Sequence, residues 1–388
     1  MNRNKRLATI AAMVLVVIAV GTTAVRIFLP TPTPVPCPLM EDATVTAPAI
    51  WVTDATPELD IRGENEAGDL LFEQARTATI LSDGRIVIAD MMALDLKFFD
   101  SSGELIRTVG RKGEGPSEFS DVDWLGRCGG DSLYVYDSRN TRLTVMDGTG
   151  AVARMNRLPA TAEWIWASIA CSPTGKFVAM AFPLHARIHL DGDSPFYKTA
   201  TFLLDASGNV LDTLGEFPIF ENRPLGKRTR MLVTDSTFLL ATMDSSAIDV
   251  YGYDGQHSST LFLGGPIRPM TEHHYRTGII SEVATQTTSS QGRAQFFDML
   301  IDIPMPEYLP PYSDVLLDSE GLVWAVLSLP GDSLTYLRAT DVSGSIVADV
   351  QLPVEVHVYE IGQDYILAGY DAEDGQPHVV KYRMRRGD

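Results

Sequence analysis

Two stretches of the sequence repeat the same order of features and decide the fold. The first runs Asp60-Ile-Arg-Gly-Glu-Asn-Glu-Ala-Gly68, then Leu71-Phe72, then Thr79-Ile-Leu-Ser-Asp-Gly84-Arg-Ile-Val-Ile-Ala-Asp90. The second runs Thr108-Val-Gly-Arg-Lys-Gly-Glu-Gly115, then Glu118-Phe119, then Gly129-Gly-Asp-Ser132-Leu-Tyr-Val-Tyr-Asp137. Each stretch has a strand end, a Gly-rich loop, a Phe, a turn and a strand that ends in Asp. One supersecondary unit is therefore repeated, which is the sequence signature of a repeat architecture.

Within this unit, short segments rich in Val, Ile, Leu, Phe and Tyr alternate with turns. The first unit is predicted to contain strands at Arg85 to Ala89, Leu96 to Phe99 and Leu105 to Val109. Gly reaches positive φ at low cost and an Asp or Ser side chain can bond the local backbone, so Asp, Ser and Gly together indicate turns. Asp-x-x-Gly turns begin at Asp100, Asp147, Asp205, Asp318 and Asp341. The pattern predicts antiparallel hairpins, with no long amphipathic helix before about residue 270.

Counting one sheet for each pair of turns gives six units. They lie near residues 75–126, 127–165, 166–227, 228–311, 312–353 and 354–388. The last unit lacks a fourth strand, while the strand from Glu58 to Gly63 has no three strands before it. If this early strand completes the last sheet, the chain closes into a ring without free edges, as β-propellers do.

We therefore predict an all-β fold, a six-bladed β-propeller over residues 58–388 that is closed by its N-terminal strand. An open β-sandwich or a pair of barrels is the competing architecture. It explains neither the even number of units nor the unmatched strand at each end.

Three segments carry a resemblance to a known family. Val109-Gly-Arg-Lys-Gly-Glu-Gly-Pro116-Ser-Glu-Phe119 is similar to a Gly-Arg-x-Gly-x-Gly-Pro-x-Glu-Phe loop, and the segment from Pro310 to Trp324 and the strand ending at Asp137 match as well. The group that these segments resemble is that of the six-bladed propellers related to NHL-repeat domains, especially exported bacterial ones of undefined function. The resemblance spans about residues 58–388. It implies the fold and no particular activity, because propellers host many unrelated functions.

The N-terminus predicts export. A basic head, Asn2 to Arg6, precedes an uncharged apolar run from Leu7 to Val25. At about 1.5 Å per residue, a helix over this run approaches the hydrocarbon thickness of about 30 Å, and the basic head favours an inside position for its own end. Residues 1–29 are thus predicted to be an uncleaved signal anchor with a transmembrane helix, or a cleaved signal peptide.

Residues 30–57 are interpreted as a Pro-rich linker and lead-in, since Pro30 to Pro38 favours a stiff, extended spacer. Both readings of the N-terminus place the remainder of the chain outside the cytoplasm. An anchored chain is a single-pass protein of the cell membrane, and a cleaved one is secreted or periplasmic.

The composition limits the partners. Hydrophobic residues make up 45% of the 388 residues and charged residues 21%, which indicates a folded chain. The formal net charge is −19, and four basic residues precede the first acidic one, Glu41, so the body is still more acidic. Nucleic acid and anionic lipid both need clustered Lys and Arg. We expect a protein or small-molecule ligand, no nucleic acid, and contact with the membrane through the N-terminal helix alone.

The motifs predict no catalytic set and no cofactor. The stretch from Gly110 to Gly115 lacks the following helix and the Lys-Ser/Thr ending of a P-loop, so we interpret it as a connection between blades. A Gly-x-Ser-x-Gly elbow is absent. His185 and His189 can share a face of a strand, with Asp191 and Asp193 nearby. A zinc site usually takes three or four converging ligands, so we predict no metal site.

Cys128 and Cys171 lie at equivalent points, just before a turn, in consecutive units. In an exported chain this placement suggests a disulfide between neighbouring blades. Two buried free thiols are the alternative, because a disulfide depends on a geometry that the sequence does not show.

Residues from about 264 to 311 interrupt the repeat. Thr271 can cap a helix over Glu272 to Ala284, and Gln291 to Ile301 can form a second. Insertions on a regular scaffold often carry function. A packing flap over one blade is the alternative interpretation.

Propeller ligands usually meet the face that carries the loops between blades and the central hairpin loops. The residues expected on this face are Arg62, Asp90, Arg111, Lys112, Glu114, Asp137, Arg139 and Arg142. Arg offers paired donors to a carboxylate or another anion. For Asp90 and Asp137, which end strands, a role as acceptors for loop amides is favoured over ligand binding.

These features favour an extracytoplasmic binding or scaffolding module without enzymatic activity. The alternative is a metal-dependent hydrolase or lyase with a site in the central channel, because lactonases and lyases on related propellers hold metal there; this sequence shows no matching set of ligands. A structural piece of an envelope complex is a third hypothesis.

Overall fold

A computed structural model describes the chain from residue 49 to residue 387. Within this range it leaves out residues 66, 160–163, 184–195, 222–224, 227, 244, 265–267, 287–289, 302, 330–331, 354 and 373. The predicted signal segment and the Pro-rich stretch up to residue 48 lie outside the described residues. No helix within the described ranges is long and apolar enough to cross a membrane.

The first three sheets, blades 1 to 3, each have four antiparallel strands in chain order. Blade 1 consists of β4 (Ala75–Ile80), β5 (Ile86–Asp90), β6 (Asp95–Phe99) and β7 (Leu105–Gly110). Blade 2 consists of β8 (Trp124–Arg127), β9 (Leu133–Asp137), β10 (Arg142–Met146) and β11 (Val152–Arg157). Blade 3 consists of β12 (Trp164–Cys171), β13 (Phe177–Pro183), β14 (Phe196–Leu204) and β15 (Val210–Glu221).

Blades 4 to 6 follow the same plan, with additions from the start of the described chain. Blade 4 consists of β16 (Arg230–Val233), β17 (Thr237–Ala241), β18 (Ala247–Gly252) and β19 (His257–Phe262). Blade 5 consists of β20 (Asp314–Leu317), β21 (Val323–Val326), β22 (Thr335–Thr340) and β23 (Ile346–Leu352), with the parallel strand β1 (Ala49–Ile50) beside β23. Blade 6 consists of β24 (His357–Ile361), β25 (Tyr365–Asp371) and β26 (Pro377–Arg385).

Two early strands pair with the last strand of blade 6. The strand β3 (Leu59–Arg62) runs antiparallel to β26, with Ile61 opposite Val379. The short strand β2 (Val52–Thr53) is also antiparallel to β26. Part of the stretch interpreted as a lead-in therefore pairs with the propeller sheets.

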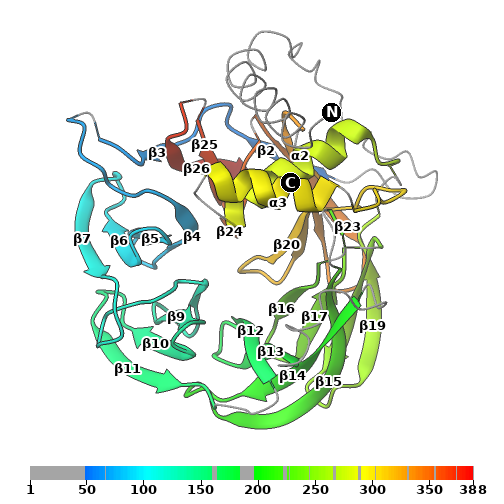
Figure 1. The fold of residues 1–388 in the computed structure, drawn as a ribbon, viewed down its shortest axis with the longest axis horizontal. Helices are drawn as coiled ribbons and strands as arrows, with labels where there is room; N and C mark the ends of the chain where they lie inside the picture. Colours follow the sequence, from blue (N-terminus) through cyan, green and yellow to red (C-terminus); the bar gives the residue numbers. More distant parts are fainter. Residues whose placement is uncertain are drawn as a thin grey trace, which may run out of the picture. The chain divides into compact units, whose positions relative to one another are not determined.

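The innermost strands of the six blades form a closed ring (Figure 1). Each contacts the inner strand of the next blade, in the order β4, β8, β12, β16, β20, β24 and again β4. The blades begin at residues 75, 124, 164, 230, 314 and 357, each within three residues of the predicted start. The six-bladed β-propeller predicted from the repeat is confirmed.

The turn between the third and fourth strands repeats in detail. At Asp100, for example, one carboxylate oxygen accepts hydrogen bonds from the backbone N–H groups of Ser102 and Glu104, and Gly103 has φ 88°. The pairing also shifts register beside this turn in five blades, between Phe98 and Phe99 in blade 1 and at equivalent places in blades 2 to 5. A bulge at a constant place shows that the blades share one hairpin geometry.

The core lies between neighbouring blades. Every residue of β5, β9 and β10 is buried, whereas the outer strands β7 and β11 are mostly exposed. Between blades 5 and 6, the fully buried Trp324 packs on Trp51 with ring centroids 5.7 Å apart. Because blades cover one another on both faces, their middle strands are continuous apolar runs rather than alternating ones.

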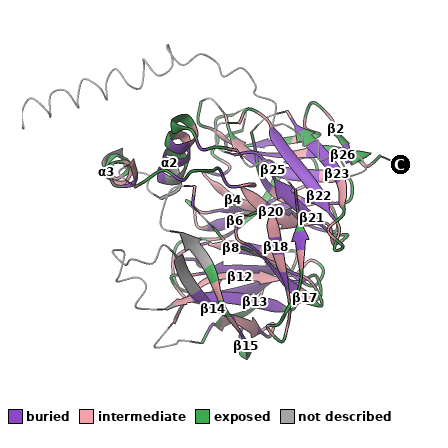
Figure 2. Ribbon diagram, turned by 90° about the vertical axis from the view of Figure 1, so that its right-hand side faces the viewer, coloured by how far each residue is buried: buried purple, intermediate pink, exposed green. Residues whose placement is uncertain are grey.

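The segment between β19 and β20 forms two helices, α2 (Glu272–Gln286) and α3 (Ser290–Ile301), on one side of the ring (Figure 2). The Thr271 hydroxyl accepts a hydrogen bond from the backbone N–H of His274 at 3.2 Å, as an N-cap does. The two predicted helices are confirmed, the first ending two residues later than predicted. Tyr275, Ile279 and Leu300 bury their side chains in one cluster with Leu329, which follows blade 5's second strand.

Polar groups gather where the inner strands of blades 6, 1 and 2 end. The Glu360 carboxylate accepts hydrogen bonds from the hydroxyls of Thr79 and Tyr365 and lies 3.5 Å from Nη2 of Arg127. Burial and the nearby Glu360 raise the pKa of the Tyr365 hydroxyl well above its usual value. This cluster ties three blades together at that end of the channel.

Candidate functional site

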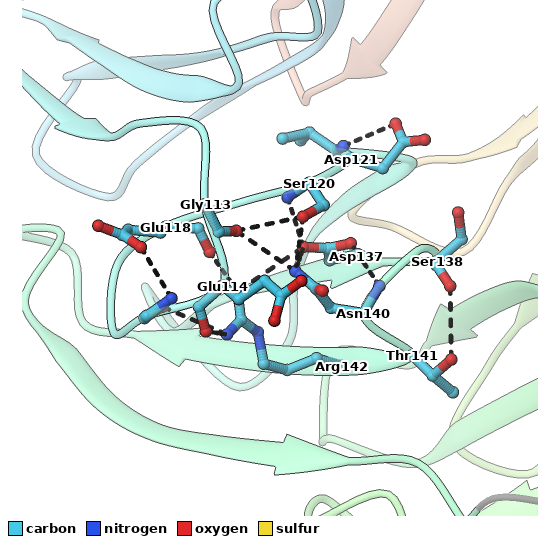
Figure 3. A network of polar contacts seen from close by, with 12 residues as sticks. Gly113, Glu114, Glu118, Ser120, Asp121, Asp137, Ser138, Asn140, Thr141 and Arg142 are labelled. Carbon is cyan, nitrogen blue, oxygen red and sulfur yellow. Dashed lines mark hydrogen bonds and ion pairs between the residues drawn. The ribbon is translucent and has the colours of Figure 1, made fainter.

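The Gly-rich loop of residues 110–120 is held by the hairpin between β9 and β10 (Figure 3). The buried Arg142 guanidinium donates hydrogen bonds to the carbonyl oxygens of Glu114 at 2.8 Å, of Gly115 at 3.2 Å and of Glu118. Its Nη2 also lies 3.7 Å from the carboxylate of Asp137, which is fully buried. Arg142 thus brings together three residues of the predicted ligand face, itself, Glu114 and Asp137. Its hydrogen bonds hold the loop in place.

The glycines of this loop are needed for close packing. Gly110 has φ 111°, and a Cβ atom there would lie 2.8 Å from the Phe119 ring; Gly113 has φ 154°. The Glu118 carboxylate accepts from the Gly115 N–H at 2.8 Å and from Arg111, and these bonds hold its pKa below the usual value. The prediction that the loop is a connection between blades agrees with this geometry.

The two predicted face aspartates have the same role in blades 1 and 2. The Asp90 carboxylate accepts from the N–H groups of Glu73 at 2.9 Å and Gln74 at 3.3 Å. The Asp137 carboxylate accepts from the N–H groups of Ser120 and Asn140, both at 2.9 Å. Each fully buried carboxylate therefore binds the loop that enters its blade, which is the structural role favoured from the sequence.

The other predicted face residues are exposed, and each of the three arginines among them lies beside its own acidic residue. Arg62 lies 3.6 Å from Asp60, Arg111 lies 2.6 Å from Glu118, and Arg139 lies 3.2 Å from Asp121. Lys112 and the side chain of Glu114 are exposed as well. Arg139 also lines a cavity of about 420 Å³ between blades 2 and 3, together with Trp164 and Trp166. Among the described residues, no hydrogen bond or ion pair joins Arg62 or Asp90 to the network around Arg142.

A cavity of about 490 Å³ lies where the inner strands begin, and we call it the mouth cavity. Arg230 and His357 are the first residues of β16 and β24, and Arg76 is the second residue of β4. Its charged and imidazole side chains are Arg76, Asp121, Asp123, Arg228, Arg230 and His357. Its apolar side chains are Met91, Val122, Leu225, Met243, Pro310 and Leu329. The mouth cavity therefore combines several polar groups with an apolar wall, as ligand sites do.

Charged side chains of neighbouring blades interact with one another at the mouth cavity. Arg230 of blade 4 lies 2.9 Å from Asp314 of blade 5. Desolvation lowers the pKa of His357 in blade 6; among the charges, Asp314 opposes this effect, while Arg230 and Arg76 reinforce it. The His357 side chain is exposed to the solvent that fills the cavity, and the other lining residues surround it. Its ring is thus mainly neutral at pH 7.

The helical insertion contributes to the mouth cavity through Gly278 and Ser281 of α2. A Cβ atom on Gly278 would lie 2.5 Å from the Leu225 side chain, so the helix approaches that loop closely. Leu225 and Met243, which also line the cavity, have left-handed backbone, with φ 51° and 58°. Non-Gly residues in this region cost free energy and cluster at functional sites.

A smaller cavity of about 220 Å³ adjoins the mouth cavity and shares Arg76, Met91 and His357 with it. It extends to His378, whose Nδ1 lies 2.7 Å from the Asp60 carboxylate. Arg76 therefore lines two neighbouring cavities.

The sequence interpretation missed the residues of the mouth cavity and chose the loops around it. Arg76, Arg230 and His357 lie at or next to the start of their inner strands. The repeat does not mark these positions, because β8 and β12 begin with Trp124 and Trp164 instead. The two residues that α2 supplies are not marked either, because the packing of α2 is not part of the repeat.

The structure joins Cys128 and Cys171 in a disulfide, with Cα atoms 6.0 Å apart. Cys128 precedes β9 and Cys171 ends β12, so the bond connects blades 2 and 3. His185 and His189, considered for a metal site, lie outside the described residues. In the parts that are described, no group of three or more His, Cys, Asp or Glu residues is arranged to hold a metal ion.

No family model matches this sequence, and no curated protein is significantly similar to it. Several solved structures are similar. A member of the DUF4221 family from Bacteroides vulgatus ATCC 8482 is 9% identical, with a TM-score of 0.52 over 87% of this chain and 99% of that chain. A protein described as exported, from Bacteroides fragilis NCTC 9343, is 13% identical, with a TM-score of 0.49 over 88% and 98%.

A streptogramin B lyase is 10% identical, with a TM-score of 0.41 over 84% of this chain and 88% of that chain. At these identities the likeness concerns the fold alone. The six-bladed propeller fold, predicted from the repeat and the Gly-rich loop, is confirmed, and the DUF4221 structure is similar to it at the level of the fold.

Proposed function

We propose that this chain is an extracytoplasmic binding module whose ligand occupies the mouth cavity. The observation that carries the proposal is the cavity itself. Its volume of about 490 Å³ falls within the range of about 300–1,000 Å³ that is usual for small-molecule sites. Four blades and the insertion supply the side chains named above, so the site is built by the fold as a whole.

The ligand on this proposal is a small molecule or a short segment of a protein. The formal net charge of −19 disfavours nucleic acid, which binds clustered basic residues. The loops that enter blades 1 and 2 then serve as a frame. The side chains of Arg142, Asp90 and Asp137 form hydrogen bonds with backbone groups of these loops.

A defined fragment library, scored by saturation-transfer NMR on the full-length chain, tests the proposal. Ser281→Trp fills the cavity from α2, whereas Ile280→Trp changes a neighbouring residue of the same helix that is 60% exposed and does not line the cavity. We expect fragment binding to be lost in Ser281→Trp and kept in Ile280→Trp. Fragments that bind Ser281→Trp as well as the natural chain would show that the cavity is not the site.

The extracytoplasmic location is supported by the disulfide, since disulfides persist in oxidising compartments. We propose further that the apolar run from Leu7 to Val25 remains as a membrane anchor. Intact mass measurement of the chain recovered from membranes tests the anchor. A mass lacking the first residues would replace the anchor by a cleaved signal peptide and leave export in place.

We also propose that the pairing of β3 with β26 holds the ring shut. Supporting this role, Ile61 of β3 is 2% exposed and packs in the core between blades 6 and 1. An Ile→Ala change at such a site costs about 2–5 kcal/mol. Hydrogen exchange of Ile61→Ala is expected to be faster at the β26 amides; unchanged exchange there would contradict the role.

A further inference from the structure

We propose that the mouth cavity selects a small organic carboxylate, whose charged end binds Arg76 and whose apolar body lies against Met91 and Leu225. This inference rests on the proposed function, because it names the ligand class of the same cavity. It follows from how the charges of the cavity are partnered.

The basic groups of the mouth cavity differ in their partners. Arg230 is paired with Asp314 at 2.9 Å. The exposed side chain of Arg76, in contrast, has no hydrogen bond or ion pair with any residue in the described part of the chain. A guanidinium presents parallel donors that match a carboxylate, so Arg76 offers an unused anion site within the cavity.

The acidic groups of the mouth cavity are already engaged. The Asp121 carboxylate lies 3.2 Å from Nε of Arg139 and accepts from the Val122 N–H at 2.9 Å. The Asp123 carboxylate accepts from the Ser138 N–H at 2.9 Å. These donors from blade 2 reduce what the two carboxylates can offer to a cationic ligand. Arg76, in contrast, has no hydrogen-bond or ion-pair partner among the described residues.

His357 adds to this preference. It lines both cavities, as Arg76 does, and the positive charges of Arg76 and Arg230 disfavour its protonated form. A carboxylate bound between these groups would offset that repulsion. An anion in a chain of net charge −19 then meets a locally positive pocket, which gives selectivity against neutral and cationic analogues.

The apolar wall indicates that the ligand is more than a bare anion. Met91 and Leu225 line the mouth cavity and are only half-buried, and Met91 also lines the smaller cavity. An inorganic anion would leave these side chains against water. A carboxylate with an apolar body covers them and gains the free energy of their burial.

Three compounds of nearly equal shape test the inference: benzoate, benzamide and benzamidine, with charges of −1, 0 and +1. Each is titrated into the full-length chain and followed by ligand-observed NMR, with inorganic phosphate as a fourth probe. A charge-assisted pair predicts that benzoate binds about tenfold more tightly than benzamide. Benzamidine and phosphate are expected to bind more weakly than benzoate.

Variants connect the preference to Arg76. Arg76→Gln is expected to remove the tenfold preference for benzoate, and Arg76→Lys to keep part of it. Arg293→Gln makes the same change of charge at an exposed arginine of α3 outside the cavity, and the preference is expected to persist. Equal loss in Arg293→Gln would overturn the inference, since the effect would then be one of net charge.

The outcomes separate this inference from the proposed function. If benzamide binds the natural chain as tightly as benzoate and does not bind Ser281→Trp, the carboxylate preference is overturned and the cavity remains the binding site. Phosphate that binds as tightly as benzoate would overturn the organic part of the inference. Benzoate that binds Ser281→Trp unchanged would contradict both.

Discussion

Two polar regions of this propeller lie at the same end of the inner strands and differ in how their groups are used. The first region surrounds the Gly-rich loop of residues 110–120. There the buried side chains of Arg142 and Asp137 form hydrogen bonds with backbone groups of this loop and of the β9–β10 hairpin. At the mouth cavity, Arg76 has no such partner among the described residues. The first region is a frame, and the second keeps an unused binding group.

The difference teaches that a polar residue on the binding face is not by itself a binding residue. What decides its role is whether the fold already satisfies its hydrogen bonds. A buried group with its partners in place stabilises the fold, and removing one partner leaves the others without hydrogen bonds. An exposed group in a cavity contributes little to stability and is available to a ligand.

The largest effect is expected from the frame. Arg142→Ala removes a guanidinium that is 7% exposed, along with its bonds to three carbonyl oxygens, and leaves the buried Asp137 carboxylate unpaired. Breaking a buried pair in this way costs about 3–5 kcal/mol. Chemical denaturation of the variant measures this loss in the free energy of unfolding.

Arg139→Ala is the matched control, three residues earlier in the same hairpin. Its side chain is 73% exposed and its ion pair with Asp121 lies at the surface. We expect a loss of only about 0–1 kcal/mol. Equal losses for the two arginines would break the distinction between frame and surface.

The disulfide allows a test of whether the two regions are independent, because neither Cys128 nor Cys171 lines the mouth cavity. Replacing Cys128 and Cys171 together with Ser opens a loop of 43 residues between blades 2 and 3. The gain in unfolded-state entropy predicts a loss of about 2–4 kcal/mol in the free energy of unfolding. Benzoate binding is expected to be unchanged at temperatures where the variant stays folded. Lost binding in the folded variant would show that the two regions are coupled.

Arg76→Gln is expected to show the opposite pattern. Because Arg76 has no partner in the described part of the chain, its replacement should change the free energy of unfolding by less than about 0.5 kcal/mol. Benzoate affinity should fall about tenfold. Arg111→Gln, at the outer loop, should leave that affinity unchanged, since Arg111 is paired with Glu118 and does not line the cavity. The reverse result would assign anion binding to the loop.

The smallest effect is expected from pH and depends on His357. Its pKa lies below the ordinary value of 6.5, through desolvation first and then, among charges, through Arg230 and Arg76 against Asp314. A lowered pKa means that the neutral ring stabilises the fold above pH 6.5 and that this contribution is lost as the pH falls through the folded-state pKa.

A bound carboxylate favours the protonated ring, so benzoate binding should tighten as the pH falls below 6.5. Titrations at a series of pH values measure this dependence, and His357→Gln should remove it. A dependence that survives in His357→Gln would assign it to another group.

The sequence predicted the architecture because the repeat is expressed in turn chemistry and strand pattern. Asp100 and its equivalents each fix a hairpin through local bonds, and such local signals are readable residue by residue. The roles of Asp90 and Asp137 were predicted for the same reason, since each ends a strand and binds the loop that enters its blade.

The residues of the proposed site were not predicted, because their positions depend on contacts between distant segments. Arg76, Arg228 and Ser281 meet only when the ring closes and α2 packs against the loop at Leu225. The sequence interpretation chose the loops at this end of the ring because of their Gly and Arg content. Arg76, next to the start of an inner strand, carries the charge without a partner among the described residues.

A crystal structure of the full-length chain with benzoate would show whether a carboxylate binds Arg76 in the mouth cavity. We expect density for the ligand in the mouth cavity, with its carboxylate within hydrogen-bonding distance of the Arg76 guanidinium. Density beside Arg111 or Arg139 on the outer loops, with an empty mouth cavity, would contradict it.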